Sequence, residues 1–307
     1  MHRFLTPSYI FNSIRIKTKA LALSLRYAAS PYETYATDIV IKDTPSYELN
    51  FKDKFSSLGY FELQSAEQYY GQTTYLTTDI ILALVEYNQM LADKTVNPDR
   101  LIELANNIEE KGEWRANELW FSVETHLPKF DQDGETHSGI IQSKAASLFL
   151  RVFKETGDKD YLKWARSALL PCAVDVKKGG LHIKNKSLKS WVEEYKTDTP
   201  SMVLNGYIFV LIALAEYLTF DKRATFQKIF EDGLSTALAW LPHYKKGGDI
   251  LYSMYNWDIC NVHYMGVSYY QMKHLYKITK VKSFKKYYKH VYEHTDLDLF
   301  LDLTNNS

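Results

Sequence analysis

Apolar residues recur at helical spacing along the chain from Thr74 onwards. Residues three and four positions apart lie on one face of an α-helix, so this spacing predicts helices that each bury one side. The expected helices span residues 77–92, 98–112, 138–154, 160–174, 200–218, 222–241, 262–279 and 283–294. Two of them begin at a proline, Pro98 and Pro200, which suits the first turn because its N–H would have no helical partner there.

Polar stretches rich in aromatic residues separate the predicted helices. The segment from Trp114 to Glu135 is one of them, with a strand expected near residues 119–123. The glycine pairs at 179–180 and 247–248 each precede a short apolar run, which is typical of a turn that leads into a strand. Short and long connections thus alternate, which predicts an (α/α) toroid or incomplete barrel with its long loops at one rim.

We expect three parts along the chain. Residues 1–30 form a basic N-terminal segment, residues 31–73 form a small extended or β arm, and residues 74–307 form the helical domain. The best strand candidate of the arm is residues 37–41, where β-branched residues gather. The expected fold class is therefore mostly α, with a small extended or β N-terminal part.

Bulk composition excludes some classes of protein. The formal net charge is +0, so the chain has no overall basic field that would attract nucleic acid. Its 2 cysteines, Cys172 and Cys260, form no CxxC pair and define no disulfide framework. Aromatic residues make up 15% of the chain, and such side chains either fill cores or stack on sugar rings.

The N-terminal segment bears on where the protein is expected. No run of about 18 apolar residues is present, so we expect no transmembrane helix. Ala28-Ala29-Ser30 resembles a signal-peptide cleavage site, but basic residues interrupt the apolar run that would have to precede it. These basic residues are Arg15, Lys17, Lys19 and Arg26. We therefore expect a cytoplasmic protein whose basic amphipathic N-terminal segment is able to contact a membrane surface or a partner.

The stretch from Glu193 to Gly206 joins two kinds of residue. Glu193, Glu194 and Tyr195 lie just before the expected helix start at Pro200, where loops on a rigid scaffold tend to carry chemistry. Gly206 interrupts the apolar run that follows, and glycine inside a helix costs about 1 kcal/mol relative to alanine. Close packing or a nearby ligand would explain this glycine better than helix propensity does.

The same stretch resembles one protein family. Glu193-Glu194-Tyr195, Pro200-Ser201 and Val203-Leu204-Asn205-Gly206 resemble the EEY…PS.VLNG signature of the D-glucuronyl C5-epimerase C-terminal domain. The segment from Gln142 through Arg151 to Asp158 resembles a helix and turn of that family. The resemblance covers roughly residues 74–294 and is more specific as a combination than any one motif.

This resemblance implies a chemistry. The family converts D-glucuronate to L-iduronate at C5 within an acidic polysaccharide, such as heparosan or a capsule polymer. A proton leaves the carbon next to the carboxylate and returns on the opposite face, which needs two acid–base groups. Mapped onto this chain, the family's catalytic tyrosines are Tyr195, Tyr252 and Tyr264. Because an unperturbed tyrosine has a pKa of about 10, we expect nearby positive charge to favour the phenolate.

The resemblance also implies substrate-binding groups. The expected set is Glu193, Glu194, Asn205, Arg151, Gln142 and His263. Arg151 is expected to support the site without reacting. The implied partner is an acidic polysaccharide, and we expect neither a cofactor nor a metal. The sequence leaves open whether the chain is a monomer or a homodimer.

The chain departs from the family pattern near its last tyrosine. Met265 and Ser268 stand where the family has histidines, and Ser253 stands where it has an aspartate. His263 lies beside Tyr264 and compensates in part. These departures put the substrate in question. They also favour an alternative in which the chain is a degenerate family member that binds polysaccharide without converting it.

Two other enzyme classes fit the same scaffold. A uronate lyase shares the first step, C5 proton abstraction, and then expels the C4 substituent. An (α/α) glycosidase needs two carboxylates that flank the scissile bond, roughly 5–10 Å apart. The carboxylates available for that role are Glu193, Glu194, Asp198 and Asp249.

Other polar clusters favour plain structural explanations. Asp131 and Asp133 begin like a calcium loop, but no matching acidic residues follow, which favours a solvated turn. His126, His137 and His182 lack the spacing of a transition-metal site. Four lysines near the C-terminus are typical of a solvated helix face, although they could meet a polyanion. They are Lys282, Lys285, Lys286 and Lys289.

Overall fold

The computed structural model describes most of the chain beyond residue 75. The described residues are 76–127, 130, 132–185, 188–197, 200–255 and 258–296, without the side chains of His126 and His263. The expected N-terminal segment (1–30) and arm (31–73) therefore lie outside the described residues.

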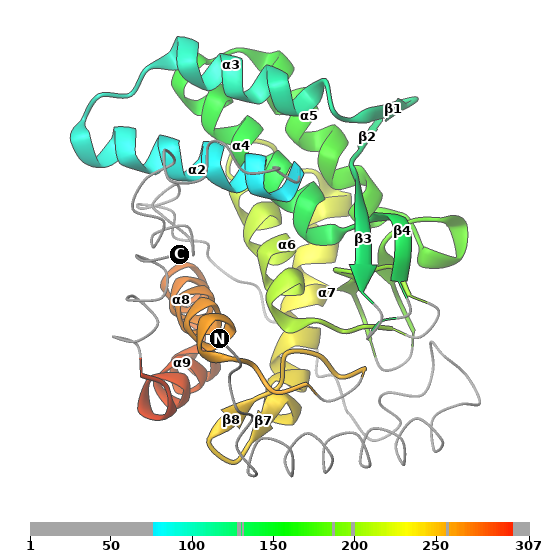
Figure 1. The fold of residues 1–307 in the computed structure, drawn as a ribbon, viewed down its shortest axis with the longest axis vertical. Helices are drawn as coiled ribbons and strands as arrows, with labels where there is room; N and C mark the ends of the chain where they lie inside the picture. Colours follow the sequence, from blue (N-terminus) through cyan, green and yellow to red (C-terminus); the bar gives the residue numbers. More distant parts are fainter. Residues whose placement is uncertain are drawn as a thin grey trace, which may run out of the picture.

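The described residues are mostly helical, as predicted (Figure 1). The helices are α2 (Leu76–Asp93), α3 (Pro98–Glu109), α4 (Gly139–Thr156), α5 (Lys159–Leu169), α6 (Leu204–Tyr217), α7 (Ala224–Trp240), α8 (Val262–Thr279) and α9 (Lys282–His294). The strands pair as antiparallel hairpins: β1 (Glu113–Arg115) with β2 (Glu118–Trp120), β3 (Ser122–Leu127) with β4 (Gln132–His137), β5 (His182–Ile183) with β6 (Trp191–Val192), and β7 (Lys245–Lys246) with β8 (Asp249–Ile250). Within the described ranges these elements do not close into a barrel.

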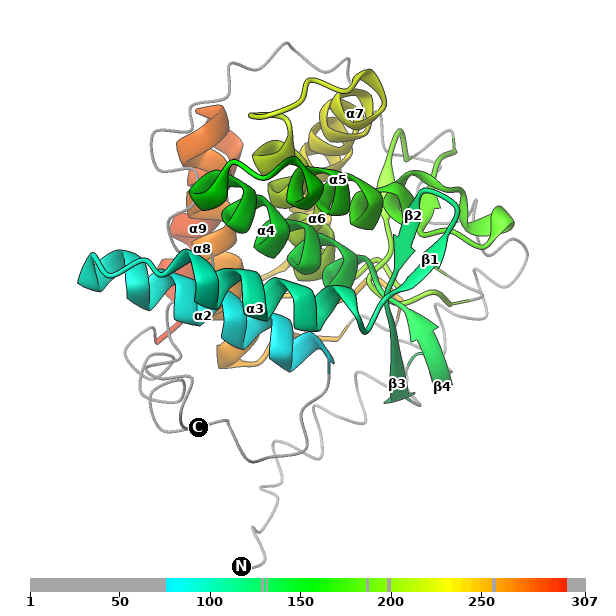
Figure 2. The same cartoon turned by 90° about the horizontal axis from the view of Figure 1, so that it is seen from above.

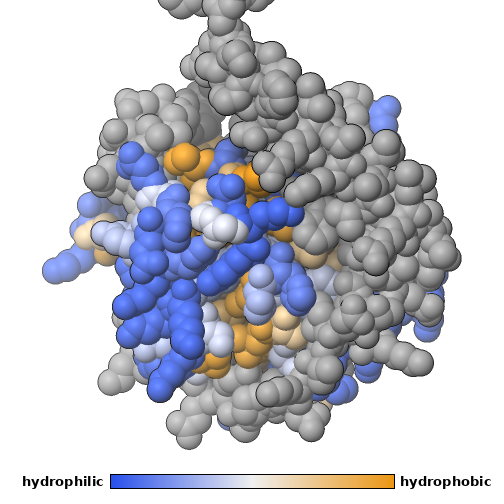
Figure 3. Space-filling model, turned by 90° about the horizontal axis from the view of Figure 1, so that it is seen from below, coloured by the Kyte–Doolittle hydropathy of each residue, from blue (hydrophilic) through white to orange (hydrophobic). Residues whose placement is uncertain are grey.

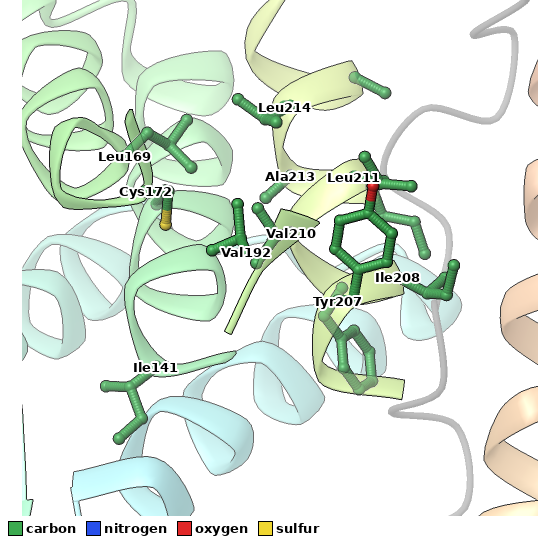
Figure 4. Packing of buried hydrophobic residues seen from close by; sticks show 14 of the residues in the cluster. Ile141, Leu169, Cys172, Val192, Tyr207, Ile208, Val210, Leu211, Ala213 and Leu214 are labelled. Atoms are coloured by element: carbon green, nitrogen blue, oxygen red, sulfur yellow. The ribbon is translucent and has the colours of Figure 1, made fainter. Parts of the chain in front are cut away.

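Helix α6 is the centre of the core. All of its residues are buried, because apolar side chains face every direction around its axis. Figure 4 shows Tyr207, Ile208 and Leu211 of α6 packed among residues from several elements. Burying one such large side chain contributes about 1.5–3 kcal/mol, so α6 is the rigid element on which the loops rest.

Helix α4 lies beside α6 and links it to the outer helices. Seen from above, α4 runs between the α2–α3 pair and α5, with α6 behind it (Figure 2). Helices α8 and α9 pack against each other as a separate pair, and α8 also contacts α6. The fold is therefore a stack of helix pairs around α4 and α6, with the hairpins at their ends.

Local sequence signals fix the ends of the helices. Gly157 ends α4 in the left-handed conformation (φ 73°) and donates its N–H to the carbonyl of Phe153 at 2.8 Å. Asp158 then caps α5 through the N–H of Asp160. Asn97 caps α3 in the same way and leaves a proline in the first turn.

Two predicted boundaries were wrong. The helix expected from Pro200 begins at Leu204, because the preceding residues form a turn in which Met202 adopts φ +46°. The helix expected over residues 160–174 ends at Leu169 and continues as a 3₁₀ turn over Leu170–Ala173. Pro171 has no N–H to continue the α-helical ladder, which accounts for this second change.

The surface of the described residues is mixed in character. On the face seen from below, hydrophilic residues cover one side, and hydrophobic residues lie beside and between them (Figure 3). None of the described helices is both long enough and apolar enough to cross a bilayer.

Candidate active site

The β5–β6 hairpin carries Glu193 and Glu194 to the N-terminal ends of α4 and α6. The carbonyl of Glu193 accepts the N–H of Gly139 at 3.0 Å, at the start of α4. A Cβ on Gly139 would lie 2.5 Å from that same carbonyl oxygen, so the close approach requires glycine. Because the N-terminus of a helix carries a partial positive charge, this position suits carboxylates.

Glu193 fixes the turn that precedes α6. Its buried carboxylate accepts the N–H of Ser201 at 2.7 Å, the N–H of Met202 at 3.2 Å and the hydroxyl of Ser201. Burial raises the pKa of Glu193 to about 7, although these hydrogen bonds oppose the rise. The carbonyl of Met202 accepts the hydroxyl of Tyr244 at 2.6 Å, so the positive φ of Met202 is held by hydrogen bonds at both its N–H and its carbonyl. In this structure Glu193 therefore holds the backbone, and its carboxylate faces the turn.

Glu194 lies against the first turn of α6. A Cβ on Gly206 would lie 2.1 Å from Oε2 of Glu194, so only glycine lets the carboxylate approach this closely. Close packing therefore explains the glycine in this helix. The neighbouring Asn205 is buried, and its backbone carbonyl accepts the side-chain amide of Gln271 on α8 at 2.8 Å.

Tyr252 reaches the same carboxylate from the segment after β8. Its carbonyl accepts the N–H of Leu204 at 3.0 Å, and its N–H donates to the backbone carbonyl of Asp258 at 2.6 Å, so both sides of the residue are held. Its hydroxyl donates to Oε1 of Glu194 at 3.3 Å. The start of α6 thus positions both members of this hydrogen bond.

Tyr264 and Tyr195 complete a cluster around Tyr252. Tyr264 lies in the first turn of α8, and its ring centroid is 4.7 Å from that of Tyr252. Tyr195 stacks on Phe130 with centroids 5.0 Å apart. The hydroxyl of Tyr252 lies within interaction range of those of Tyr195 and Tyr264, and the charge of Glu194 acts on all three phenols. The structure therefore brings Tyr195, Tyr252 and Tyr264 together at one carboxylate.

The electrostatics of this cluster favour protonated phenols. Burial raises the pKa of Tyr195, Tyr252 and Tyr264, and the negative charge of Glu194 raises it further. This direction is opposite to the one expected from a nearby positive charge. The tyrosines are therefore proton donors at rest, and Glu194 is the acceptor among them.

Comparison with known proteins identifies the family of this chain. The profile of the family described as D-glucuronyl C5-epimerase C-terminus matches residues 110–293, more than half of the chain. The chain belongs to this family.

Two curated relatives illustrate how far the similarity extends. An uncharacterized protein of Methanocaldococcus jannaschii is 29% identical over 180 residues, which are 57% of this chain and 56% of that protein. A D-glucuronyl C5-epimerase of Caenorhabditis elegans is 28% identical over 131 residues, which are 38% of this chain and 21% of that protein. The chain thus matches about half of the first relative and about a fifth of the second.

Two residues that the epimerase resemblance suggested for substrate binding lie away from the tyrosines. The amide of Gln142 is buried, donates to the carbonyls of Leu119 and Ala168 at 2.9 Å each, and accepts the N–H of Phe121 at 2.7 Å. Arg151 is buried in an ion pair with Glu216, with 3.1 Å between Nη2 and Oε1. Both side chains hold α4 to its neighbours in this structure.

The three positions that depart from the epimerase pattern are buried, Ser253 in the segment after β8 and the other two on α8. Met265 and Ser268 both point into the protein, on the helix that carries Tyr264. The side chain of His263 and the whole of Asp198 lie outside the described part of the chain. Asp249 is exposed on β8, and Asp131 also lies outside the described residues.

Lys144 is a residue that the sequence interpretation missed. It lies on α4 with 4% of its surface exposed, and its ammonium is 4.1 Å from the ring centroid of Phe209. Burial lowers the pKa of Lys144 to about 7, and the charge of Glu194 opposes this shift. The signal was present in the sequence, because Lys144 is seven residues before Arg151 and therefore lies on the same helix face.

Proposed function

We propose that the protein epimerises D-glucuronate to L-iduronate at C5 within an acidic polysaccharide. The observation that carries this proposal is the meeting of three tyrosines from separate segments around the buried carboxylate of Glu194, which accepts the hydroxyl of Tyr252. Family membership supports it, because the shared profile is that of the D-glucuronyl C5-epimerase C-terminus.

The reaction needs only groups that this cluster supplies. One tyrosine oxygen takes the C5 proton, and the electron pair of the broken C–H bond passes into the substrate carboxylate as an enediolate. A second tyrosine donates its hydroxyl proton to C5 from the opposite face, which forms the new C–H bond. The first tyrosine's original hydroxyl proton, held meanwhile by Glu194, then passes through the cluster to the second tyrosine, so no net proton is gained or lost.

Glu194 makes the first tyrosine a base. A buried phenol with a raised pKa does not ionise by itself near neutral pH. Glu194 is within hydrogen-bond distance of Tyr252 and can take its hydroxyl proton as Tyr252 takes the C5 proton. A tyrosine hydroxyl of the cluster that is not transferring a proton can then donate a hydrogen bond to the enediolate and stabilise its negative charge.

Several finer features belong to this proposal. The polymer is of the heparosan or capsule type, the protein is cytoplasmic, and the helical domain covers residues 74–307. The helices form an arc of an incomplete (α/α) toroid, and the loops with the three tyrosines lie at one rim. The segment that carries Tyr252 contacts the N-terminal end of α6 and the Glu194 side chain of the β6–α6 loop, which supports a shared rim.

The test is deuterium incorporation at C5 of heparosan in D₂O, followed by NMR. We expect wild type to incorporate deuterium and Tyr195→Phe, Tyr252→Phe and Tyr264→Phe to lose at least about 100-fold in rate, since each removes an acid–base hydroxyl. Tyr161→Phe is the matched control, because that hydroxyl donates to Asn106 away from the cluster. No incorporation on any glucuronate polymer would overturn the proposal.

The same spectra separate the epimerase from its rivals. An epimerase yields L-iduronate signals, whereas a lyase yields an unsaturated uronate with new ultraviolet absorbance. Binding of the polymer by wild type without any exchange would identify a non-catalytic polysaccharide-binding member of the family.

A further inference from the structure

Helices α4 and α6 run parallel and in register along a seam that holds two buried cations. Lys144 and Arg151 are seven residues apart on α4, which places them on one face. Arg151 pairs with Glu216 on α6, and the ammonium of Lys144 lies over Phe209, seven residues before Glu216. The two cations therefore occupy equivalent places two helical turns apart.

The anion that faces Lys144 comes from outside α6. Oε2 of Glu194 lies against Gly206, where the absence of a side chain leaves room for it. Gly206 is one turn before Phe209 on the same face of α6. Glu194 is the group whose charge acts on Lys144, and it is itself buried. Because water is largely excluded here, the attraction between the two charges is much stronger than at the surface.

Other charged groups on the elements around α4 have partners of their own. Glu216 binds Arg151 and accepts the hydroxyl of Ser147 at 2.6 Å. Glu193 faces the 201–202 turn. On α2, Tyr87 donates to Glu155, and burial and that carboxylate raise the pKa of Tyr87.

Among the described residues, the other helices packed against α4 place no buried charged side chain beside Lys144. The buried residues of α3 are apolar, and those of α5 are apolar except for Tyr161 and Ser167. His274 on α8 lies near Arg151, and burial lowers its pKa to about 3, so it is neutral. Glu194 is thus the charged partner of Lys144 along this seam.

We propose that Lys144 is a positioning residue whose buried ammonium keeps Glu194 ionised, so that Glu194 can accept a tyrosine proton. This inference rests on the proposed function. Burial disfavours the charged form of a carboxylate such as Glu194, and the N-terminal end of α6 and the charge of Lys144 oppose that tendency. Lys144 is charged below about pH 7, which is the range in which a buried carboxylate is at risk of protonation.

The first test is the pH dependence of C5 deuterium exchange. We expect Lys144→Gln to move the acid limb of the rate profile to higher pH by about 1–3 units, because the cation that favours the carboxylate is gone. Lys144→Arg keeps the charge and should keep the wild-type limb. Lys154→Gln is the matched control, since it removes an exposed cation from the same helix and should change nothing.

A purely structural lysine would give a different result. Lys144→Gln would then lower the melting temperature or the yield of folded protein, while the remaining enzyme would keep the wild-type pH profile. That outcome, or an acid limb in Lys144→Arg that matches Lys144→Gln, would overturn the inference.

A second measurement does not depend on activity. In protein labelled with ¹³C at the lysine ε carbon, NMR should show one lysine that titrates near pH 7 and is missing from Lys144→Arg. In Glu194→Gln that lysine should titrate at lower pH, because its anion is lost. If wild type exchanges no uronate but the lysine behaves this way, the proposed function fails and the pairing stands. If Glu194→Gln leaves the titration unchanged, the inference fails whatever the activity.

Discussion

Gly206 controls how closely Glu194 can approach α6. A Cβ at this position would lie 2.1 Å from Oε2, 2.6 Å from Cβ and 2.8 Å from Cδ of Glu194. Cβ of Glu194 is bonded directly to the backbone and cannot rotate away, so the whole residue would have to shift. Alanine would improve helix propensity by about 1 kcal/mol, but a clash of this kind costs about 1–3 kcal/mol and wins.

We expect Gly206→Ala to displace Glu194 from Tyr252 and to lower the rate of C5 exchange by about tenfold or more, because small displacements in a site have large effects on rate. Exchange per folded molecule is the measurement. Gly233→Ala on α7 is the control, since its Cβ would meet Leu211 Cδ2 at 2.6 Å, outside the tyrosine cluster. It should lower stability and leave exchange per folded molecule intact. Equal exchange in both variants would contradict this role of Gly206.

At the scale of single residues, the sequence predicted which groups gather but not what each one does. The motif around Tyr195 pointed to Glu194, Tyr252 and Tyr264, and these residues do lie together. The family resemblance also suggested Gln142, but the amide of Gln142 forms its hydrogen bonds with backbone groups of other segments. Such partners are 21 to 26 positions away, so no local pattern reveals them.

The ion pair between α4 and α6 decides how firmly these two helices are joined. Arg151 and Glu216 are fully buried, and removal of one partner leaves the other charge without compensation. We expect Arg151→Met to cost about 3–5 kcal/mol in free energy of unfolding, measured by urea denaturation. The double variant Arg151→Met/Glu216→Leu should recover most of this loss, because both buried charges are then gone.

Exchange activity of the double variant distinguishes the scaffold from the site. A folded Arg151→Met/Glu216→Leu protein with near wild-type C5 exchange would assign Arg151 to the scaffold. A stable double variant without exchange would instead restore the substrate-binding role suggested by the family resemblance.

Elements were predictable where their signals were local. The apolar spacing of α8 and the Gly157–Asp158 junction between α4 and α5 are complete within the sequence of those elements. The start of α6 was not predictable, because the turn before it is held by Glu193 and Tyr244 from other parts of the chain. Pro200 correctly indicated that a helix begins nearby, but the helix begins four residues later, at Leu204.

At the scale of the whole molecule, the site exists only when three distant segments meet. Tyr195 follows β6, Tyr252 follows β8, and Tyr264 begins α8. Periodicity predicts the helices but not which loops adjoin, and this is why the tyrosine cluster could be expected only from the family resemblance. Under the proposed function, contacts that join α8 to α6 are therefore expected to affect C5 exchange as well as stability.

Gln271 is such a contact. It lies seven residues after Tyr264, on the same face of α8, and its amide donates to the carbonyl of Asn205 at 2.8 Å. We expect Gln271→Met to keep the shape but remove this hydrogen bond between α8 and α6, at a cost of about 0.5–1.5 kcal/mol. Tyr264 should then sit less firmly against Tyr252, and C5 exchange should fall by about tenfold or more. Thr279→Val is the control, because its hydroxyl donates to the carbonyl of Leu275 and accepts the N–H of Val281, both at the opposite end of α8 from Tyr264. If both variants lose stability alike and both keep wild-type exchange, the docking of α8 on α6 does not set the position of Tyr264.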